Sequence, residues 1–197
     1  MLRVAVLVSG GGTNLGAIIE KKKSGGIKNG ELALVLSSKA GVFALERAKA
    51  ADIPFEVVER KSFATNEEYN SAILKTLKDY NIDVVVLAGF LSILSETVVN
   101  AYENKIINVH PALIPSFCGK GYYGLRVHEQ ALKKGVKVTG ATVHFVNGEA
   151  DGGKIILQKA VEVKEGDTPE ILQKRVMEQA EWCLLPKALD MLCNGEI

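Results

Sequence analysis

The sequence has few cysteines and no excess of charge of either sign. Its three cysteines, Cys118, Cys183 and Cys193, are odd in number and form no CxxC pair. They argue against a disulfide framework or a zinc cluster and favour a reducing compartment. With 24 basic and 23 acidic residues the formal net charge is +1, which gives no support for binding to nucleic acid or to a membrane surface.

Long apolar runs and low-complexity segments are also missing. The first apolar stretch, which ends at Ser9 and Gly10, is too short to cross a bilayer and has no signal cleavage pattern. No repeat or obvious linker interrupts the 197 residues. We therefore expect a single domain over 1–197, a cytoplasmic location, and neither a nucleic-acid nor a membrane partner.

Short apolar runs alternate with helical patterns through the first half of the chain. Strands are predicted at 4–8, 32–36, 55–58, 83–88 and 106–110, with helices at 14–23, 42–51, 66–80 and from 91 to about 102. Strands that are apolar throughout and separated by helices predict an α/β fold, Rossmann-like, with a mostly parallel sheet and helices on both faces.

The pattern changes in the last third of the chain. Strands predicted at 138–146 and 154–163 are joined by a hairpin-type connection, which indicates an antiparallel C-terminal extension of the sheet. One final helix is predicted after Thr168, a suitable N-cap, with Pro169 at its first position.

A glycine-rich loop, Ser9-Gly10-Gly11-Gly12-Thr13-Asn14, links the first strand to the first helix. Glycines let backbone N–H groups approach an anion, and a helix N-terminus favours negative charge. No Gly-Lys-Ser/Thr follows, and Leu15 stands where a dinucleotide fingerprint needs glycine. The loop alone leaves two interpretations open, an ordinary tight turn and a site for a phosphate or other anion, and for the second a phosphate monoester is favoured over a dinucleotide.

Two polar residues end an otherwise apolar strand in the stretch INVHPALIP. Side chains two apart share one face of a strand, so Asn108 and His110 point the same way, and Pro111 ends the pairing. At the carboxyl end of a parallel strand they reach the ligand-binding crevice. A histidine moves protons near neutral pH, and an amide donates to an oxyanion. Hydrogen bonds to local backbone are the structural alternative for both residues.

Asp151 is the remaining candidate, within Glu149-Ala150-Asp151-Gly152-Gly153. Asp-Gly is an ordinary turn sequence, but a carboxylate brought to His110 favours the charged imidazole. His128 and His144 have no metal-like spacing, so we expect no metal site, and His144 is predicted to be a packed or supporting residue. A serine hydrolase is not indicated, because no GxSxG elbow is present.

These motifs, together with the segment AGFLSIL at 88–94, give the sequence a strong resemblance to the phosphoribosylglycinamide formyltransferases, a folate-dependent formyltransferase family. The resemblance covers nearly the whole chain. It implies a cytoplasmic enzyme of de novo purine biosynthesis that transfers the formyl group of 10-formyltetrahydrofolate, its co-substrate, to the amino group of glycinamide ribonucleotide. No metal is implied, and a homodimer is left open.

The resemblance also implies roles for individual residues. Asn108, His110 and Asp151 match the catalytic trio, in which Asn108 and a protonated His110 stabilise the oxyanion while Asp151 keeps His110 charged. Glu181 matches a carboxylate that contacts the nucleotide. The loop for the substrate phosphate is matched by Gly12, Thr13 and Asn14, and the folate-binding segment by Leu91, Ser92, Ile93 and Leu94, with Asn108 beside it.

Two departures from the family pattern concern the folate side. Ser92 and Asn66 stand where relatives often carry basic residues that meet the glutamate tail of the folate. The glycine-rich loop 118–124 is longer than in many relatives, and we interpret it as a mobile flap over the site.

Three other functions remain as alternatives. A methionyl-tRNA formyltransferase shares the catalytic strand, but it usually carries an additional C-terminal tRNA-binding domain. A formyltetrahydrofolate hydrolase usually has an N-terminal regulatory domain. A non-catalytic nucleotide-binding module is disfavoured because Asn108, His110 and Asp151 are all present.

Overall fold

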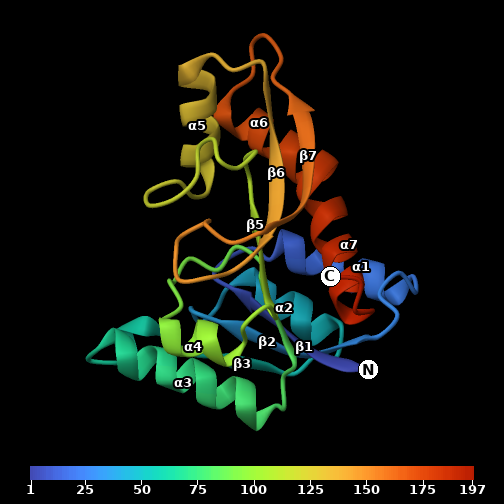
Figure 1. The fold of residues 1–197 in the computed structure, drawn as a ribbon, viewed down its shortest axis with the longest axis vertical. Helices are drawn as coiled ribbons and strands as arrows, with labels where there is room; N and C mark the ends of the chain where they lie inside the picture. The colour runs from blue at the N-terminus through green and yellow to red at the C-terminus, as the bar shows by residue number, and fades with distance from the viewer.

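A computed structural model describes residues 1–197, and its strands form one sheet of seven in the order β3-β2-β1-β4-β5-β6-β7 (Figure 1). The first five strands pair in parallel, β6 pairs antiparallel with β5, and β7 pairs antiparallel with β6. The predicted fold class is confirmed. The strands are β1 Leu2–Val8, β2 Gly30–Ser37, β3 Phe55–Val57, β4 Val84–Leu87, β5 Ile106–His110, β6 Val138–Phe145 and β7 Ile155–Glu162.

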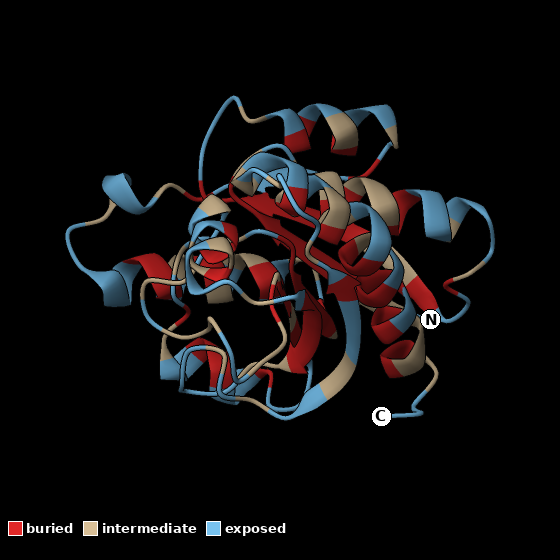
Figure 2. Cartoon of the chain, turned by 90° about the horizontal axis from the view of Figure 1, so that it is seen from above, coloured by how far each residue is buried: buried red, intermediate tan, exposed pale blue.

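Helices cover both faces of this sheet, and the buried strands lie between them in the view from above (Figure 2). Successive residues of β1 serve the two sides: Val4 and Val6 belong to the larger apolar core, and Ala5 to the smaller. None of the helices has both the length and the apolar character needed to cross a membrane. The helices are α1 Thr13–Lys23, α2 Phe43–Ala50, α3 Asn66–Asp79, α4 Glu96–Ala101, α5 Leu125–Lys134, α6 Pro169–Val176 and α7 Trp182–Cys193.

The strand order reverses between β1 and β4, and this reversal creates the place for a site. From β1 the chain continues to β2 and β3 on one side, whereas from β4 it continues to β5 on the other. The connections that leave the carboxyl ends of β1 and β4 therefore diverge. In open α/β sheets ligands bind in the crevice between such connections.

The C-terminal helix and the region before β6 differ from the sequence predictions. The helix predicted after Thr168 is present, with Thr168 as its cap, but a π-helical segment, Met177–Glu181, divides it into α6 and α7. Pro186 lies within α7 and has no N–H, which removes one helical hydrogen bond just after this wider turn. Helix α5 was not predicted, although its buried residues Val127 and Ala131 recur at a helical spacing.

The connection from β6 to β7 is fixed where it enters β7. The amide of Phe145 donates to the carbonyl of Lys154, closing the loop that carries Asp151. A Cβ atom on Gly153 would lie 1.7 Å from the carbonyl oxygen of Phe145. The backbone therefore passes too close to β6 for any larger residue at this position.

We expect Gly153→Ala to lower the free energy of unfolding by about 2 kcal/mol, because the added methyl group must displace backbone. Gly148→Ala in the same loop is the matched control, since a Cβ atom there would meet nothing closer than 3.9 Å. Urea unfolding of both variants measures the difference. Equal stability of the two variants would contradict this description of the loop.

Candidate active site

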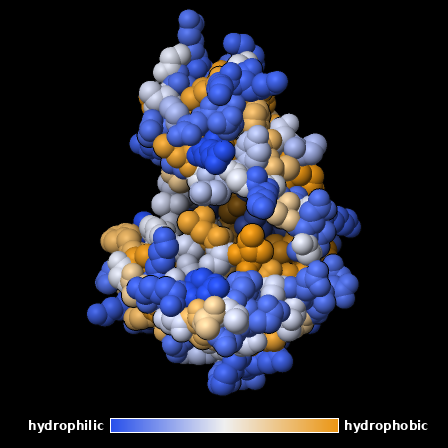
Figure 3. Space-filling view, turned by 90° about the vertical axis from the view of Figure 1, so that its left-hand side faces the viewer, coloured by the Kyte–Doolittle hydropathy of each residue, from blue (hydrophilic) through white to orange (hydrophobic).

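A cleft of about 810 Å³ opens at the carboxyl ends of the parallel strands. The space-filling view shows a hollow with exposed apolar atoms between the upper and lower parts of the molecule (Figure 3). Residues far apart in sequence line it, from the loops after β1 and β4, strand β5, the loop before α5, the β6–β7 connection and helix α6 with the π segment. Of the predicted site residues, it brings together Thr13, Asn14, Leu91, Ser92, Ile93, Asn108, His110, Asp151 and Glu181.

Strand β5 places Asn108 and His110 on the cleft side, as their spacing predicts. The side-chain nitrogen Nδ2 of Asn108 lies 3.1 Å from Nε2 of His144 on β6. His144 Nδ1 lies 2.7 Å from the carbonyl oxygen of Phe145, which can only accept, so Nδ1 carries the proton. Nε2 of His144 therefore accepts from Asn108, and His144 is the supporting residue that the sequence predicts.

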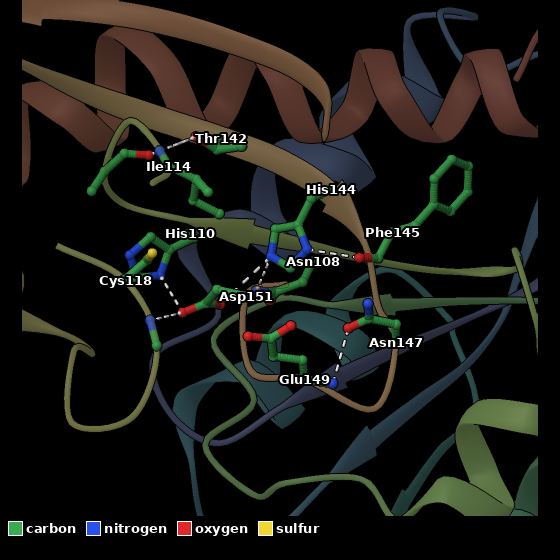
Figure 4. A network of polar contacts seen from close by, with 12 residues as sticks. Asn108, His110, Ile114, Cys118, Thr142, His144, Phe145, Asn147, Glu149 and Asp151 are labelled. Carbon is green, nitrogen blue, oxygen red and sulfur yellow. Dashed lines mark hydrogen bonds and ion pairs between the residues drawn. The ribbon is translucent and has the colours of Figure 1, made fainter. Parts of the chain in front are cut away.

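Asp151 connects the catalytic candidates to one another (Figure 4). Its backbone has a φ of 55°, a left-handed conformation that turns the side chain into the cleft. Oδ2 accepts from the amide of Gly119 at 2.8 Å and lies 3.5 Å from His110 Nδ1. Oδ1 lies 3.6 Å from His144 Nε2. The β6–β7 turn thus delivers its carboxylate to His110, which sequence spacing could not establish.

Opposing influences act on the protonation of His110. Burial is the largest and lowers the pKa of His110; Asp151 and the Phe117 carbonyl act against it without overcoming it. His110 Nε2 donates to that carbonyl at 2.8 Å. Desolvation of the ring therefore outweighs the nearby carboxylate in the protein without ligands, and the charged His110 that the resemblance implies for the reaction stays a prediction.

Asp151 itself stays ionised at neutral pH. Burial acts to raise the pKa of this carboxyl group, but the neighbouring rings of His144 and His110 and the hydrogen bond from the Gly119 amide together lower it. A negative charge therefore lies beside a neutral imidazole in the unliganded site. That arrangement accepts a proton readily when one is released nearby.

The glycine-rich loop and Glu181 form one end of the cleft. Asn14 Nδ2 donates to Glu181 Oε2 at 2.7 Å, and burial raises the pKa of Glu181. The first N–H groups of α1 have no partners within the helix. Gly12 is outside the lining: it has a φ of 67°, and a Cβ atom there would lie 2.7 Å from that of Ala44. The role visible for Gly12 is to let the start of α1 approach α2.

The segment after β4 forms the other end. Leu91 and Ile93 are 57% and 76% exposed, large values for aliphatic side chains on a cleft wall. Leu94 is only 8% exposed and packs in the smaller core. Leu94 is not among the residues that line the cleft, so the structure does not bring this predicted residue to the site.

Several residues of the site were given no role from the sequence, among them Phe117, Gly119 and His128. Phe117 and Gly119 contribute only backbone groups, to His110 and Asp151 respectively, so their residue types give no signal. His128 lines the cleft with its side chain fully buried, and neither ring nitrogen has a hydrogen-bond partner. No group of three or more His, Cys, Asp or Glu side chains is arranged to hold a metal ion.

Comparison with known proteins places this cleft in a family. The sequence profile of the family described as "Formyl transferase" matches residues 2–189. This chain belongs to the formyl transferase family. It is 40% identical to the phosphoribosylglycinamide formyltransferase of Haemophilus influenzae over 197 residues, which are 100% of this chain and 90% of that protein.

Two further comparisons support the assignment of this chain to the formyl transferase family. The solved structure of glycinamide ribonucleotide transformylase 1 from Symbiobacterium toebii superimposes with a TM-score of 0.93 at 39% identity, covering 99% of this chain and 89% of that one. The trifunctional purine biosynthetic protein adenosine-3 of Gallus gallus is 44% identical over 100% of this chain. The chain spans only 19% of that protein's length. The resemblance to phosphoribosylglycinamide formyltransferases is confirmed.

The burial of His110 predicts how it titrates. In the free protein its NMR titration midpoint lies below the ordinary 6.5. Asp151→Asn lowers the midpoint further, because the neutral amide no longer stabilises the imidazolium. Glu149→Gln, in the same loop but exposed, is the control and leaves the midpoint nearly unchanged. An unchanged or higher midpoint in Asp151→Asn would refute the assigned interaction.

His128 makes stability depend on pH. Burial lowers the pKa of His128 from 6.5 to about 4, so between these values the unfolded chain binds the additional proton. Its contribution is complete above pH 6.5 and is lost as the pH falls towards 4, with a total of about 3 kcal/mol. Urea unfolding at several pH values measures it. His128→Leu flattens this part of the profile, and an identical profile in that variant would contradict the prediction.

Proposed function

We propose that this formyl transferase moves the formyl group of 10-formyltetrahydrofolate to the amino group of glycinamide ribonucleotide, giving formylglycinamide ribonucleotide and tetrahydrofolate in de novo purine biosynthesis. The reaction is supported by the chain's similarity to proteins named phosphoribosylglycinamide formyltransferase and glycinamide ribonucleotide transformylase. One structural observation carries the assignment to the cleft. Asn108, His110 and Asp151 meet between the glycine-rich loop at one end and the 91–94 segment at the other.

The two substrates take opposite ends of the cleft in this proposal. The phosphate of the nucleotide binds the N–H groups at Gly12, Thr13 and Asn14, where the start of α1 favours negative charge. Glu181, fixed by Asn14, accepts hydrogen bonds from the nucleotide. The pterin of the folate lies against the backbone of 91–94, between the exposed side chains of Leu91 and Ile93. The formyl group then lies beside Asn108.

Asn108 stabilises the charge that develops during attack. The substrate amine adds to the formyl carbon and the carbonyl oxygen becomes an oxyanion. One N–H of the Asn108 amide is used by His144, which fixes the orientation of the side chain, and the second is free to donate to that oxygen. A donor oriented before the reaction needs no reorganisation when the charge appears.

His110 and Asp151 carry the proton. On attack the amine nitrogen becomes acidic. Once the Phe117 carbonyl has released Nε2 and the ring proton lies on Nδ1 beside Asp151, Nε2 of the neutral imidazole accepts the amine proton directly or through one water molecule. Asp151 stabilises the resulting imidazolium. The proton then passes to N10 of the folate as the bond between that nitrogen and the formyl carbon breaks. The same imidazolium strengthens the positive field at the oxyanion while it lasts.

The loop before α5 takes part in this cycle. The carbonyl of Phe117 occupies His110 Nε2, and the amide of Gly119 occupies Asp151 Oδ2. Nε2 reaches a substrate only when the Phe117 carbonyl gives up this hydrogen bond. The proposed flap at 118–124 thus begins beside a contact that must open during catalysis.

We expect Asn108→Ala and His110→Ala each to lower kcat by about 10²–10³, the usual cost of losing one oxyanion donor or the proton carrier. Asn100→Ala, an exposed position on α4, is the matched control and keeps wild-type turnover. Thermal unfolding confirms that all three variants fold. Turnover near wild type in either cleft variant would refute the role assigned to that residue.

The same assay separates the alternative functions. Wild-type protein is given 10-formyltetrahydrofolate with glycinamide ribonucleotide, with methionyl-tRNA, or with water as the only acceptor. Formylglycinamide ribonucleotide as the main product supports the proposal. Formyl-methionyl-tRNA or free formate as the main product would instead assign the methionyl-tRNA formyltransferase or the hydrolase, and binding without transfer would leave a binding module.

A further inference from the structure

The segment between β4 and α4 has no regular secondary structure, yet three buried polar side chains from other elements fix it. It projects Leu91 and Ile93 into the cleft with 57% and 76% of their surfaces exposed. An irregular loop with exposed aliphatic side chains tends to collapse onto nearby apolar surface unless its backbone is held. The hydrogen bonds to this loop therefore decide its shape.

The first contact comes from the end of β1. Ser9, with 4% of its surface exposed, accepts from the amide of Leu91 at 2.9 Å through its hydroxyl oxygen. The same oxygen lies 2.6 Å from the hydroxyl of Ser38. Ser9 is the first residue of the glycine-rich loop, and its hydroxyl holds the segment at the other end of the cleft.

The other two contacts come from consecutive residues of α3. The hydroxyl of Tyr69, which is fully buried, donates to Ser92 Oγ at 3.1 Å. Asn70 is 1% exposed, and its Oδ1 accepts from the amide of Ser95 at 2.8 Å. Asn70 Nδ2 is held in turn by the carbonyl of Asn66. The segment is thereby fixed at its start, middle and end.

These three polar side chains do more than provide hydrogen-bond partners for buried groups. A buried phenylalanine at 69 or alanine at 9 would avoid desolvating a hydroxyl, so the polar residues stabilise the fold little by themselves. They orient the segment, because two of the three hydrogen bonds are made to its backbone amides. Fixing those amides fixes which backbone groups between them face the cleft.

We propose that Ser9, Tyr69 and Asn70 are positioning residues for the folate, a clamp that holds the 91–95 backbone in the shape that binds the pterin. This inference rests on the proposed function, because it takes the 91–94 segment as the folate site. The clamp does not touch the substrate. It sets the affinity for the folate by holding the binding surface ready, which removes an ordering cost from binding.

Ser9→Ala and Tyr69→Phe test the clamp. Each is expected to weaken tetrahydrofolate binding and to raise KM for 10-formyltetrahydrofolate about five- to tenfold, the factor that one hydrogen bond supplies. KM for glycinamide ribonucleotide and kcat stay within about twofold. Amide exchange at Leu91 accelerates in Ser9→Ala, which reports the loosened segment directly.

Tyr102→Phe is the matched control. Tyr102 is 6% exposed and packs in the same core as Tyr69. This variant is expected to keep wild-type KM values, so a general effect of removing a buried tyrosine hydroxyl is separated from the clamp. Asn70→Asp keeps the acceptor for the Ser95 amide and is expected to bind folate better than Asn70→Ala.

The outcomes distinguish this inference from the function on which it rests. Unchanged folate affinity in Ser9→Ala and Tyr69→Phe would overturn the clamp even if the wild type transfers formyl groups. Equal increases in both KM values would also overturn it, since they indicate general damage. If the wild type binds tetrahydrofolate but does not formylate glycinamide ribonucleotide, the variants still test the clamp by binding, and only the acceptor assignment fails. Wild-type protein that binds no tetrahydrofolate overturns both.

Discussion

The contact between Asp151 and His110 is the interaction on which the rest of the cleft depends. It joins a turn of the antiparallel extension to the last parallel strand, across 41 positions of sequence (151 − 110), and brings the loop before α5 with it through Gly119 and Phe117. Without this carboxylate, no side chain would oppose the desolvation of the imidazole. The parallel sheet forms the crevice, and the antiparallel extension contributes the carboxylate of Asp151, which stabilises a protonated His110 in the proposed mechanism.

Burial and charge act against each other at this contact, and burial dominates while no ligand is present. The pKa of His110 is lowered although an ionised carboxylate lies beside it. A base that is neutral at rest and acquires an immediate counter-ion on protonation suits a reaction in which a proton is held only briefly. In the unliganded site the Phe117 carbonyl and the Gly119 amide hydrogen-bond to His110 Nε2 and Asp151 Oδ2. In the proposed mechanism substrate replaces these contacts.

Much of the fold follows from the sequence, because continuous apolar strands and the turn residues between them are local signals. Helix α5 and the π segment were not predicted: the apolar residues of α5, such as Val127 and Ala131, do recur at a helical spacing, so its signal is present in the sequence, whereas a π turn depends on packing around Glu181. For the site, the spacing of Asn108 and His110 predicts their shared face. The approach of Asp151, the burial of His128 and the backbone contacts of Phe117 arise from tertiary structure, to which residue types alone give no guide.

The reversal of strand order between β1 and β4 also has an evolutionary consequence. The loops that we propose for the two substrates leave the neighbouring strands β1 and β4 but belong to separate connections of the chain. Changes in one loop can therefore accumulate without redesigning the other, while β5 keeps the reactive side chains at a fixed height between them. A change of acceptor specificity can therefore arise in the loop after β1, as long as Ser9 is retained. Ser9 lies in that loop and contacts the segment after β4.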